Sequence, residues 1–480
     1  MAGYQRMEET ETQPLVGGGA PKMSKNTRNI LVLVIALLLF ALVLGLGLGL
    51  PTRDPPISTG SEAEGDGGAV VEAGVGAGGT TATVGQFRHG AVASDGLPCA
   101  GVARDLLSEG GSAVDAAVAA LVCNGLYTPQ SMGIGGGFLM TVYTRATGKV
   151  EVLNARETAP GWSEPKMYHG NSSLSAYGPL SVGVPGEVAG YWAARKKYGN
   201  SSISWRRVLQ PSITMAREGV PTSATLADSI SDKNWKDPLL QEIYTDPTTG
   251  KGWVEGQFHK RLRLGETLEA LALAGDEGDD LFYRGEIAQG LVQDLEEQGG
   301  RLTLEDLASY QALWTPALSV PLSRPGLNQT EGLTLHSFPP PGSGAVLAAV
   351  LNIMQHFPKE EEVGEVLWHH RLVEAFKWAY AERSKLGDPE DVNITQQVAG
   401  LVETMTSQAW AKERVGLIRD DTTFNDVAYY GGQFDLTSDH GTAHLSVVAP
   451  NGDAVAVTST INQVILPHAI YNLSDVPYSM

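Results

Sequence analysis

The sequence feature that most constrains the fold is a pair of alternating apolar and polar runs at 442–449 and 454–462. Such alternation is typical of strands with one buried face, and the Asn-Gly pair at 451–452 is typical of the turn between two antiparallel strands. We therefore predict a β-hairpin over 442–462.

The turn decides which side chains meet across this hairpin. A two-residue loop would place Thr442 opposite Ile461, with Thr460 on the other face. A three-residue loop, in which Gly452 takes a positive φ, instead places Thr442 directly opposite Thr460. Asn462 then lies two residues further along the same face. We favour this second register because glycine supplies the backbone angle that the loop requires, and it gathers two hydroxyls and a carboxamide.

A second constraint is an uncharged apolar run from Ile30 to Leu50. At ~1.5 Å per residue, a helix of this length matches the ~30 Å hydrocarbon core of a membrane. Basic residues precede the run, so the positive-inside rule predicts residues 1–29 in the cytoplasm and the rest of the chain outside. A cleaved signal peptide is the alternative. The length of the run and of the preceding segment favours an uncleaved type II signal-anchor, which would make this a single-pass plasma-membrane protein.

Residues 51–86 follow the predicted span and are largely Gly, Ala, Thr and acidic residues, which predicts a flexible stalk. Beyond it the chain would be extracellular, where its only cysteines, Cys99 and Cys123, would form a disulfide. Two separate buried thiols are the alternative. N-x-S/T sequons predict glycosylation of the extracellular part. They stand at Asn171, Asn200, Asn328, Asn393 and Asn472.

The composition of the 480 residues excludes two broad classes of protein. Hydrophobic residues make up 42% and charged residues 18%, which is enough apolar material for a large core and excludes wholesale disorder. The formal net charge of −20 argues against a nucleic-acid binder, which needs a basic face.

The extracellular part shows a mixture of helical and strand patterns. Ser112 is a candidate N-cap for an apolar helix, and a helix over 187–198 is expected to end at Gly199 in the left-handed conformation. Residues 368–383 predict a long helix with its apolar residues on one side. Strand patterns gather at 137–154 and in the hairpin, so we expect a mixed α/β (α+β) fold.

Several familiar chemistries find no support in the sequence. It contains neither a G-x-S-x-G nucleophile elbow nor an H-E-x-x-H zinc motif, and we expect no cofactor and no metal. The glycine-rich run 133–137 lacks the spacing of a phosphate-binding loop and is better explained as a tight turn. Thr442 is a candidate nucleophile, because cleavage after Gly441 would give it a free α-amine that could act as its base. A threonine after glycine is, however, more often only the start of a strand.

Six segments, in this order along the chain, closely resemble the γ-glutamyltransferases (glutathione hydrolases). They are 131–137 (Ser-Met-Gly-Ile-Gly-Gly-Gly), 154–157 (Asn-Ala-Arg-Glu), 184–187 (Val-Pro-Gly-Glu), 386–389 (Leu-Gly-Asp-Pro), 441–449 and 458–462. The similarity runs from about Phe87 to Asn462, and the signal-anchor layout also matches.

The resemblance implies an N-terminal nucleophile hydrolase fold, an αββα sandwich. It implies self-cleavage of a zymogen between Gly441 and Thr442 into a large-subunit region, 87–441, and the start of a small-subunit region, 442–480. Thr442 would attack the γ-glutamyl amide of glutathione or its conjugates to form a γ-glutamyl-threonine ester. Water, an acceptor amino acid or a dipeptide would then take the acyl group.

The resemblance also implies roles for individual residues. Arg156 would bind the α-carboxylate of the substrate, which suits a guanidinium fork. A structural ion pair with Glu157 is its alternative role. Thr460 would support the nucleophile, Asn462 would contact the amino end of the substrate, and the cysteine pair matches a disulfide of the family.

The match stops after Asn462, because residues 463–480 resemble nothing in the family. By analogy, the fold is expected to be incomplete at the C-terminus, without the oxyanion hole and part of the substrate site. The alternative function is therefore a non-catalytic, membrane-anchored glycoprotein isoform.

Overall fold

The computed structural model describes residues 87, 89–171, 173–231, 238–322, 332–433 and 441–462. The predicted cytoplasmic tail, membrane span and stalk lie outside these ranges, as do Asn328, Asn472 and the segment after Asn462. None of the helices within the described ranges has the length and apolar character of a bilayer-crossing segment.

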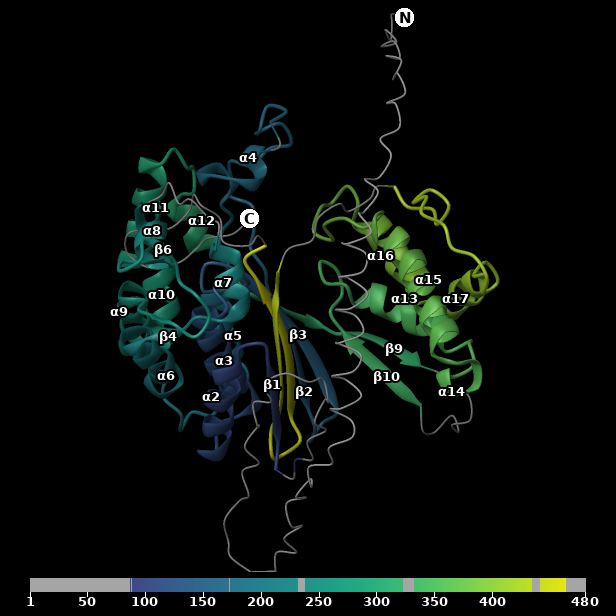
Figure 1. The fold of residues 1–480 in the computed structure, drawn as a ribbon, viewed down its shortest axis with the longest axis horizontal. Helices are drawn as coiled ribbons and strands as arrows, with labels where there is room; N and C mark the ends of the chain where they lie inside the picture. The colour runs from purple at the N-terminus through teal and green to yellow at the C-terminus, as the bar shows by residue number, and fades with distance from the viewer. Residues whose placement is uncertain are drawn as a thin grey trace, which may run out of the picture. The chain divides into compact units, whose positions relative to one another are not determined.

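An antiparallel sheet of six strands forms the centre of the described fold, in the order β1-β11-β12-β2-β3-β8 (Figure 1). Its strands are β1 (Ala91–Ser94), β2 (Gly137–Thr144), β3 (Lys149–Ala155), β8 (Leu313–Pro316), β11 (Ala443–Val448) and β12 (Ala454–Thr460). The strands predicted around 137–154 and in the C-terminal hairpin are therefore confirmed. The hairpin occupies the second and third positions of the six, between strands from much earlier in the chain.

The register of the hairpin is the one predicted from a three-residue loop. Ala443 pairs with Ser459 and Val448 with Ala454. Gly452 has a φ of 85°, and the loop closes with a 2.8 Å hydrogen bond from the Ala449 amide to the Asp453 carbonyl. The positive φ of this one glycine thus sets which residues of the two strands face each other.

Helices cover one face of the sheet (Figure 1). The buried side chains of the strands contribute to the hydrophobic core on this face. The helices include α2 (Leu97–Ser108), α3 (Ala113–Tyr127), α5 (Glu187–Tyr198) and α6 (Trp205–Glu218). The α3 helix begins as predicted, because the Ser112 hydroxyl accepts a hydrogen bond from the Asp115 amide and the Asp115 carboxylate accepts one from the Ser112 amide. A disulfide joins Cys99 of α2 to Cys123 of α3, with an S–S distance of 2.01 Å.

The left-handed conformation predicted for Gly199, at the end of α5, is wrong. The helix ends at Tyr198 as expected, but Gly199 has φ −71° and ψ 154°, which is extended rather than left-handed. A Cβ atom at this position would lie 2.6 Å from the Arg195 carbonyl oxygen and 3.1 Å from Asp115 Oδ1. Glycine is therefore needed for space and not for its backbone angle.

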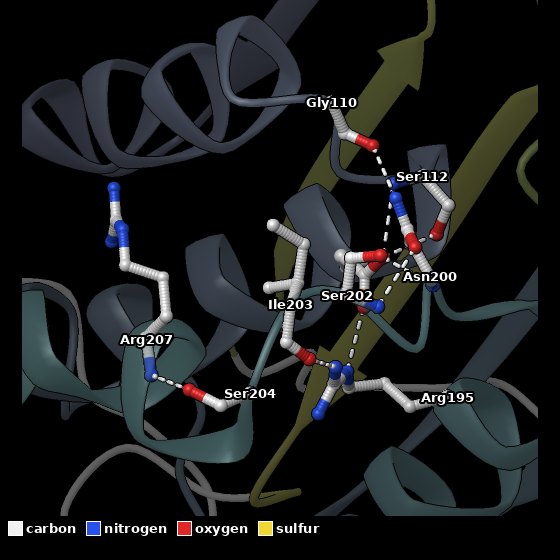
Figure 2. Close-up of polar contacts among 9 residues, drawn as sticks. Gly110, Ser112, Arg195, Asn200, Ser202, Ile203, Ser204 and Arg207 are labelled. Carbon is white, nitrogen blue, oxygen red and sulfur yellow. Dashed lines mark hydrogen bonds and ion pairs between the residues drawn. The ribbon is translucent and has the colours of Figure 1, made fainter.

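The residues after Gly199 close a polar network between α3, α5 and α6 (Figure 2). The Asn200 side chain donates a 2.7 Å hydrogen bond to the Gly110 carbonyl, and Arg195 Nη2 donates one of 2.6 Å to the Ile203 carbonyl. Arg195 also forms a 2.7 Å ion pair with the fully buried Asp115. Hydrogen bonds satisfy these polar groups, which makes their burial tolerable.

Further helices and short strands lie on the same side of the sheet as these helices (Figure 1). They are α4 (Ser173–Ala176), α7 (Ala224–Ile230), α8 (Pro238–Tyr244), α9 (Leu262–Ala274), α10 (Gly278–Tyr283), α11 (Glu286–Glu297) and α12 (Leu304–Ser309), with β4 (Val220–Pro221) paired to β7 (Phe258–His259) and β5 (Thr245–Asp246) to β6 (Lys251–Gly252).

A second hydrophobic core is built from the segment between β8 and β11. It comprises β9 (Leu318–Leu322) paired with β10 (Leu333–Ser337), and α13 (Gly344–Met354), α14 (Glu360–Val363), α15 (Glu365–Arg383), α16 (Thr395–Thr406) and α17 (Gln408–Val415). The long helix expected over 368–383 is α15. Its apolar residues Val373, Phe376 and Tyr380 share an exposed side, with exposed fractions of 51%, 43% and 51%.

Candidate active site

The candidate nucleophile stands where the hairpin strands end. Thr442 immediately precedes β11 and is exposed, as is Gly441 before it. Thr460, at the end of β12, donates a 3.3 Å hydrogen bond from its hydroxyl to the Gly441 carbonyl. That carbonyl belongs to the peptide bond whose cleavage the sequence predicts. The Asn462 amide in turn donates a 2.9 Å hydrogen bond to the Thr460 hydroxyl.

Arg156 reaches this site from the end of β3, far away in the sequence. Its Nη2 atom donates a 2.5 Å hydrogen bond to Asn462 Oδ1, and its Nε atom lies 3.3 Å from Glu157 Oε2. The two roles weighed for Arg156 therefore do not exclude each other. Its side chain is 27% exposed, whereas that of Glu157 is 5% exposed. The guanidinium is thus the solvent-accessible member of the pair.

Two further side chains fix the backbone of Arg156. Asn154 Oδ1 accepts a 3.0 Å hydrogen bond from the Arg156 amide, and the Tyr310 hydroxyl donates one of 2.7 Å to the Arg156 carbonyl. Tyr310 stacks on Tyr283 with ring centroids 5.6 Å apart. Hydrogen bonds therefore fix the backbone position from which the Arg156 side chain extends.

The glycine-rich run 133–137 is the predicted tight turn, closed by a 2.9 Å hydrogen bond from the Gly136 amide to the Gly133 carbonyl. A Cβ atom on Gly136 would lie 2.3 Å from the Thr460 carbonyl oxygen, and one on Gly137 would lie 2.4 Å from that of Ala155. These glycines let the backbone approach both β12 and the segment that leads to Arg156.

Glu187 also belongs to this region, although no sequence pattern marked it as a site residue. Glu187 is the first residue of α5, and its side chain is fully buried against Tyr191 and Ser459. Burial raises the pKa of this carboxyl to about 8, and the negative charge of Glu157 adds to the effect. An acidic residue at a helix start usually indicates only a favourable helix dipole, so the sequence offered no signal for its burial.

A polar row beside Thr442 was also missed. His444 Nδ1 lies 2.7 Å from the Thr458 hydroxyl and Nε2 lies 3.0 Å from that of Ser446. The His444 amide donates a 2.8 Å hydrogen bond to Asp95 Oδ2, which connects β11 to the end of β1. The alternation of β11 could have revealed that Thr442, His444 and Ser446 share a face.

The side chains in the described ranges form no group of three or more His, Cys, Asp or Glu residues suited to a metal ion. The chemistry that this arrangement offers is that of hydroxyls, a carboxamide and a guanidinium around one peptide carbonyl.

Comparison with known proteins matches the chain to one family. A family model for gamma-glutamyltranspeptidase matches residues 99–465. Scoloptoxin SSD14 of Scolopendra dehaani is 41% identical over 79% of this chain and 64% of its own length. Glutathione hydrolase 3 of Arabidopsis thaliana is 36% identical over 80% of this chain and 58% of its own length. The human glutathione hydrolase 5 proenzyme is 35% identical over 78% and 63%.

Solved structures agree with these matches. The γ-glutamyltranspeptidase of Helicobacter pylori is 28% identical, has a TM-score of 0.63, and is matched over 72% of this chain and 95% of the solved chain. A cephalosporin acylase of Bacillus halodurans is 26% identical with a TM-score of 0.68, over 83% and 70%. The present chain spans between 58% and 64% of the length of the three curated relatives named above.

Proposed function

Because this chain belongs to the γ-glutamyltranspeptidase family, we propose that it is a γ-glutamyl hydrolase and transferase that uses Thr442 as its nucleophile. Its substrates would be glutathione and glutathione conjugates, and its acceptors water, amino acids or dipeptides. The observation that carries the proposal is the hydrogen bond from the Thr460 hydroxyl to the Gly441 carbonyl, in the peptide bond that precedes Thr442.

The first step would be self-cleavage of the Gly441–Thr442 bond. The Thr442 hydroxyl attacks the Gly441 carbonyl carbon, the C–N bond breaks, and the hydroxyl proton passes to the released amine. The resulting ester is hydrolysed by water, which leaves a carboxylate on Gly441 and a free α-amine on Thr442. The hydrogen bond donated by Thr460 polarises the carbonyl and would stabilise negative charge on its oxygen during the attack.

The second reaction would use the new α-amine as a general base. The amine takes the proton of the Thr442 hydroxyl as the oxygen attacks the γ-carbonyl of the substrate, and the proton then goes to the leaving amine. Water or an acceptor amine cleaves the γ-glutamyl ester and regenerates the hydroxyl. The partly exposed guanidinium of Arg156 would bind the α-carboxylate of the substrate, and Asn462, already hydrogen-bonded to Arg156, would contact its amino end.

The proposed placement is a single-pass type II plasma-membrane protein, anchored by residues 30–50 with the catalytic part outside. This placement rests on the uncharged run and the basic residues before it. The alternative function is a membrane-anchored glycoprotein without catalysis.

The test is to express the 480-residue chain in a secretory host and to measure its intact mass and N-terminal sequences. We expect a fragment that begins at Thr442, together with release from a γ-glutamyl anilide. Thr442→Ala should remain a single chain and lower release by at least about 10³-fold. Thr334→Ala, which removes an exposed threonine hydroxyl from β10, outside the site, is the matched control and should be cleaved like the unmodified chain.

Unchanged release by Thr442→Ala would overturn the assignment of the nucleophile. A single, folded, unmodified chain without release would instead favour the non-catalytic alternative.

A further inference from the structure

We infer that Glu187 is a positioning residue whose buried carboxyl fastens the end of β12 to the start of α5 and so holds Thr460 against the Gly441 carbonyl. The inference deepens the proposed self-cleavage and rests on it. Among the described residues, Glu187 bonds to Tyr191, Ser459 and Gly136 and not to Gly441 or Thr442, so it would act through Thr460.

The first argument is the set of contacts that the Glu187 side chain makes. The Ser459 hydroxyl lies 3.1 Å from Oε1 and 3.0 Å from Oε2 of Glu187, and the Tyr191 hydroxyl donates a 2.6 Å hydrogen bond to Oε1. Ser459 and Glu187 are both fully buried. A buried carboxyl that lost these partners would carry a large desolvation cost, so the contact with Ser459 is strongly favoured.

The backbone of the same residue supplies the second argument. The amides of Gly186 and Glu187 donate hydrogen bonds of 2.9 Å and 3.0 Å to the Gly136 carbonyl. Gly136 packs closely against the Thr460 carbonyl, and its neighbour Gly137 pairs with Thr460 in the sheet. The side chain of Glu187 thus holds the residue before Thr460, while its backbone holds the turn that packs on Thr460.

The position of Glu187 in the chain adds a third argument. Glu187 precedes the bond that would be cleaved, and Ser459 follows it. Their contact therefore connects the two products of cleavage and does not depend on the peptide bond between Gly441 and Thr442. It would keep the Thr442 and Thr460 strands in place beside Arg156 after that bond is broken.

The charged and titratable groups around Glu187 are consistent with a neutral carboxyl. Glu157 and Arg156 act on it electrostatically with opposite signs, and Tyr191 is a neutral hydrogen-bond donor. Ser459 contributes a second hydroxyl from β12. Because a neutral acid needs only hydrogen-bond partners of the right shape, we expect glutamine to replace Glu187.

The test compares Glu187→Ala, Glu187→Gln and Ser459→Ala with the unmodified chain, through two readouts. One is the rate of cleavage at Gly441–Thr442. The other, which needs no activity, is hydrogen exchange of the Ile461 and Asn462 amides, which are bonded to the Ser131 carbonyl and the Thr460 hydroxyl. Tyr198→Phe is the matched control, because Tyr198 lies on the same helix but contacts Glu151 of β3.

We expect Glu187→Ala to slow cleavage and to accelerate exchange of these two amides, each by about tenfold, the effect of losing one buried hydrogen bond. Ser459→Ala should shift both readouts in the same direction, and it decides the matter if Glu187→Ala does not fold. Glu187→Gln and Tyr198→Phe should resemble the unmodified chain.

Unchanged exchange and cleavage in folded Glu187→Ala or Ser459→Ala would overturn the inference, as would equal shifts in Tyr198→Phe. If the unmodified chain is never cleaved, the proposed self-cleavage fails by itself. The exchange readout then still shows whether Glu187 holds the end of β12.

Discussion

At the scale of single residues, two glutamates of this molecule have carboxyl pKa values that are shifted in opposite directions. Glu187 is buried, and burial raises the pKa of its carboxyl to about 8. Glu151 is also partly desolvated, but hydrogen bonds from Tyr198, Lys149 and Lys197 outweigh this effect and lower its pKa to about 2. The sequence shows two acidic residues, and only their surroundings decide that the first favours its neutral form and the second its charged form.

The raised pKa of Glu187 predicts how the free energy of unfolding depends on pH. The folded-state pKa lies above that of the unfolded chain, so the folded state holds an extra proton between about pH 4.5 and 8. The stability that this residue contributes is present below about pH 4.5 and is lost as the pH rises to about 8. Between pH 5 and 8 the unmodified chain should lose on the order of 3 kcal/mol relative to Glu187→Gln.

Denaturant unfolding of both chains at several pH values measures this difference. Other groups titrate equally in the two chains and cancel in the comparison. Parallel pH profiles would show that Glu187 titrates near its ordinary value.

At the scale of elements, the C-terminal hairpin is specified locally. Its register depends on one three-residue loop, and that loop depends on the positive φ of Gly452. A hydrogen bond of 2.8 Å from the Arg145 amide to Asp453 Oδ1 ties the loop to the neighbouring β2–β3 turn. The same short segment thus sets the pairing that brings Thr460 to the Gly441 carbonyl at the other end of the strands.

Gly452→Ala should therefore lower the free energy of unfolding by about 1–3 kcal/mol, because alanine is strained at this φ. Its Cβ would also lie 2.3 Å from Arg145 Cδ, so that side chain would have to move. Gly148→Ala is the matched control in the β2–β3 turn, with a φ of 66° and no atom within 4 Å of the added Cβ. Denaturant midpoints should show a larger loss for Gly452→Ala, and equal losses would contradict the role of the crowded loop.

At the scale of the whole molecule, the sheet joins segments from both ends of the described chain. Residues 91–94 of β1 pair with 445–448 of β11, and β12 pairs with β2. Such distant pairings carry a large loop-closure entropy cost, which is expected to make folding slow. The polar network of Figure 2 also joins residues that are distant in the sequence, because the Asn200 side chain donates a hydrogen bond to the Gly110 carbonyl.

The structure predicts that the three sequons within the described residues, at Asn171, Asn200 and Asn393, are not equivalent. Asn171 and Asn393 are exposed, whereas the Asn200 side chain is half-buried, donates to the Gly110 carbonyl and accepts a 2.9 Å hydrogen bond from the Ser202 amide. A bulky glycan on Asn200 would compete with this packing. Peptide mapping of the secreted, folded protein, with and without N-glycosidase, should find glycans on Asn171 and Asn393 and none on Asn200.

Asn200→Gln should consequently remove no glycan but should lower the stability by about 1 kcal/mol, since the longer side chain misplaces both hydrogen bonds. Asn393→Gln, at an exposed sequon, is the control and should lose one glycan with little change in stability. A fully occupied Asn200 in the folded protein would contradict this prediction.

The sequence by itself determined what depends on neighbours in the chain. The hairpin register follows from a glycine in a turn, the start of α3 from Ser112 and Asp115, and the family from six short segments in order. Two cysteines in a predicted extracellular part favoured a disulfide over two separate thiols, and the structure contains the Cys99–Cys123 disulfide. Local signals also misled once, because a glycine after a helix favours a left-handed cap and Gly199 is glycine for lack of space.

Only the tertiary structure decided which distant residues meet. Arg156 contacts Asn462 because only one strand, β2, lies between β3 and β12 in the sheet. Glu187 contacts Ser459 because α5 packs against the face of the sheet. Neither contact leaves a periodic pattern or a turn signal, since each depends on strand order and helix packing rather than on spacing along the chain. Local conformation is encoded over a few residues, whereas burial, and with it the pKa of Glu187, arises only when the whole fold excludes water from that carboxyl.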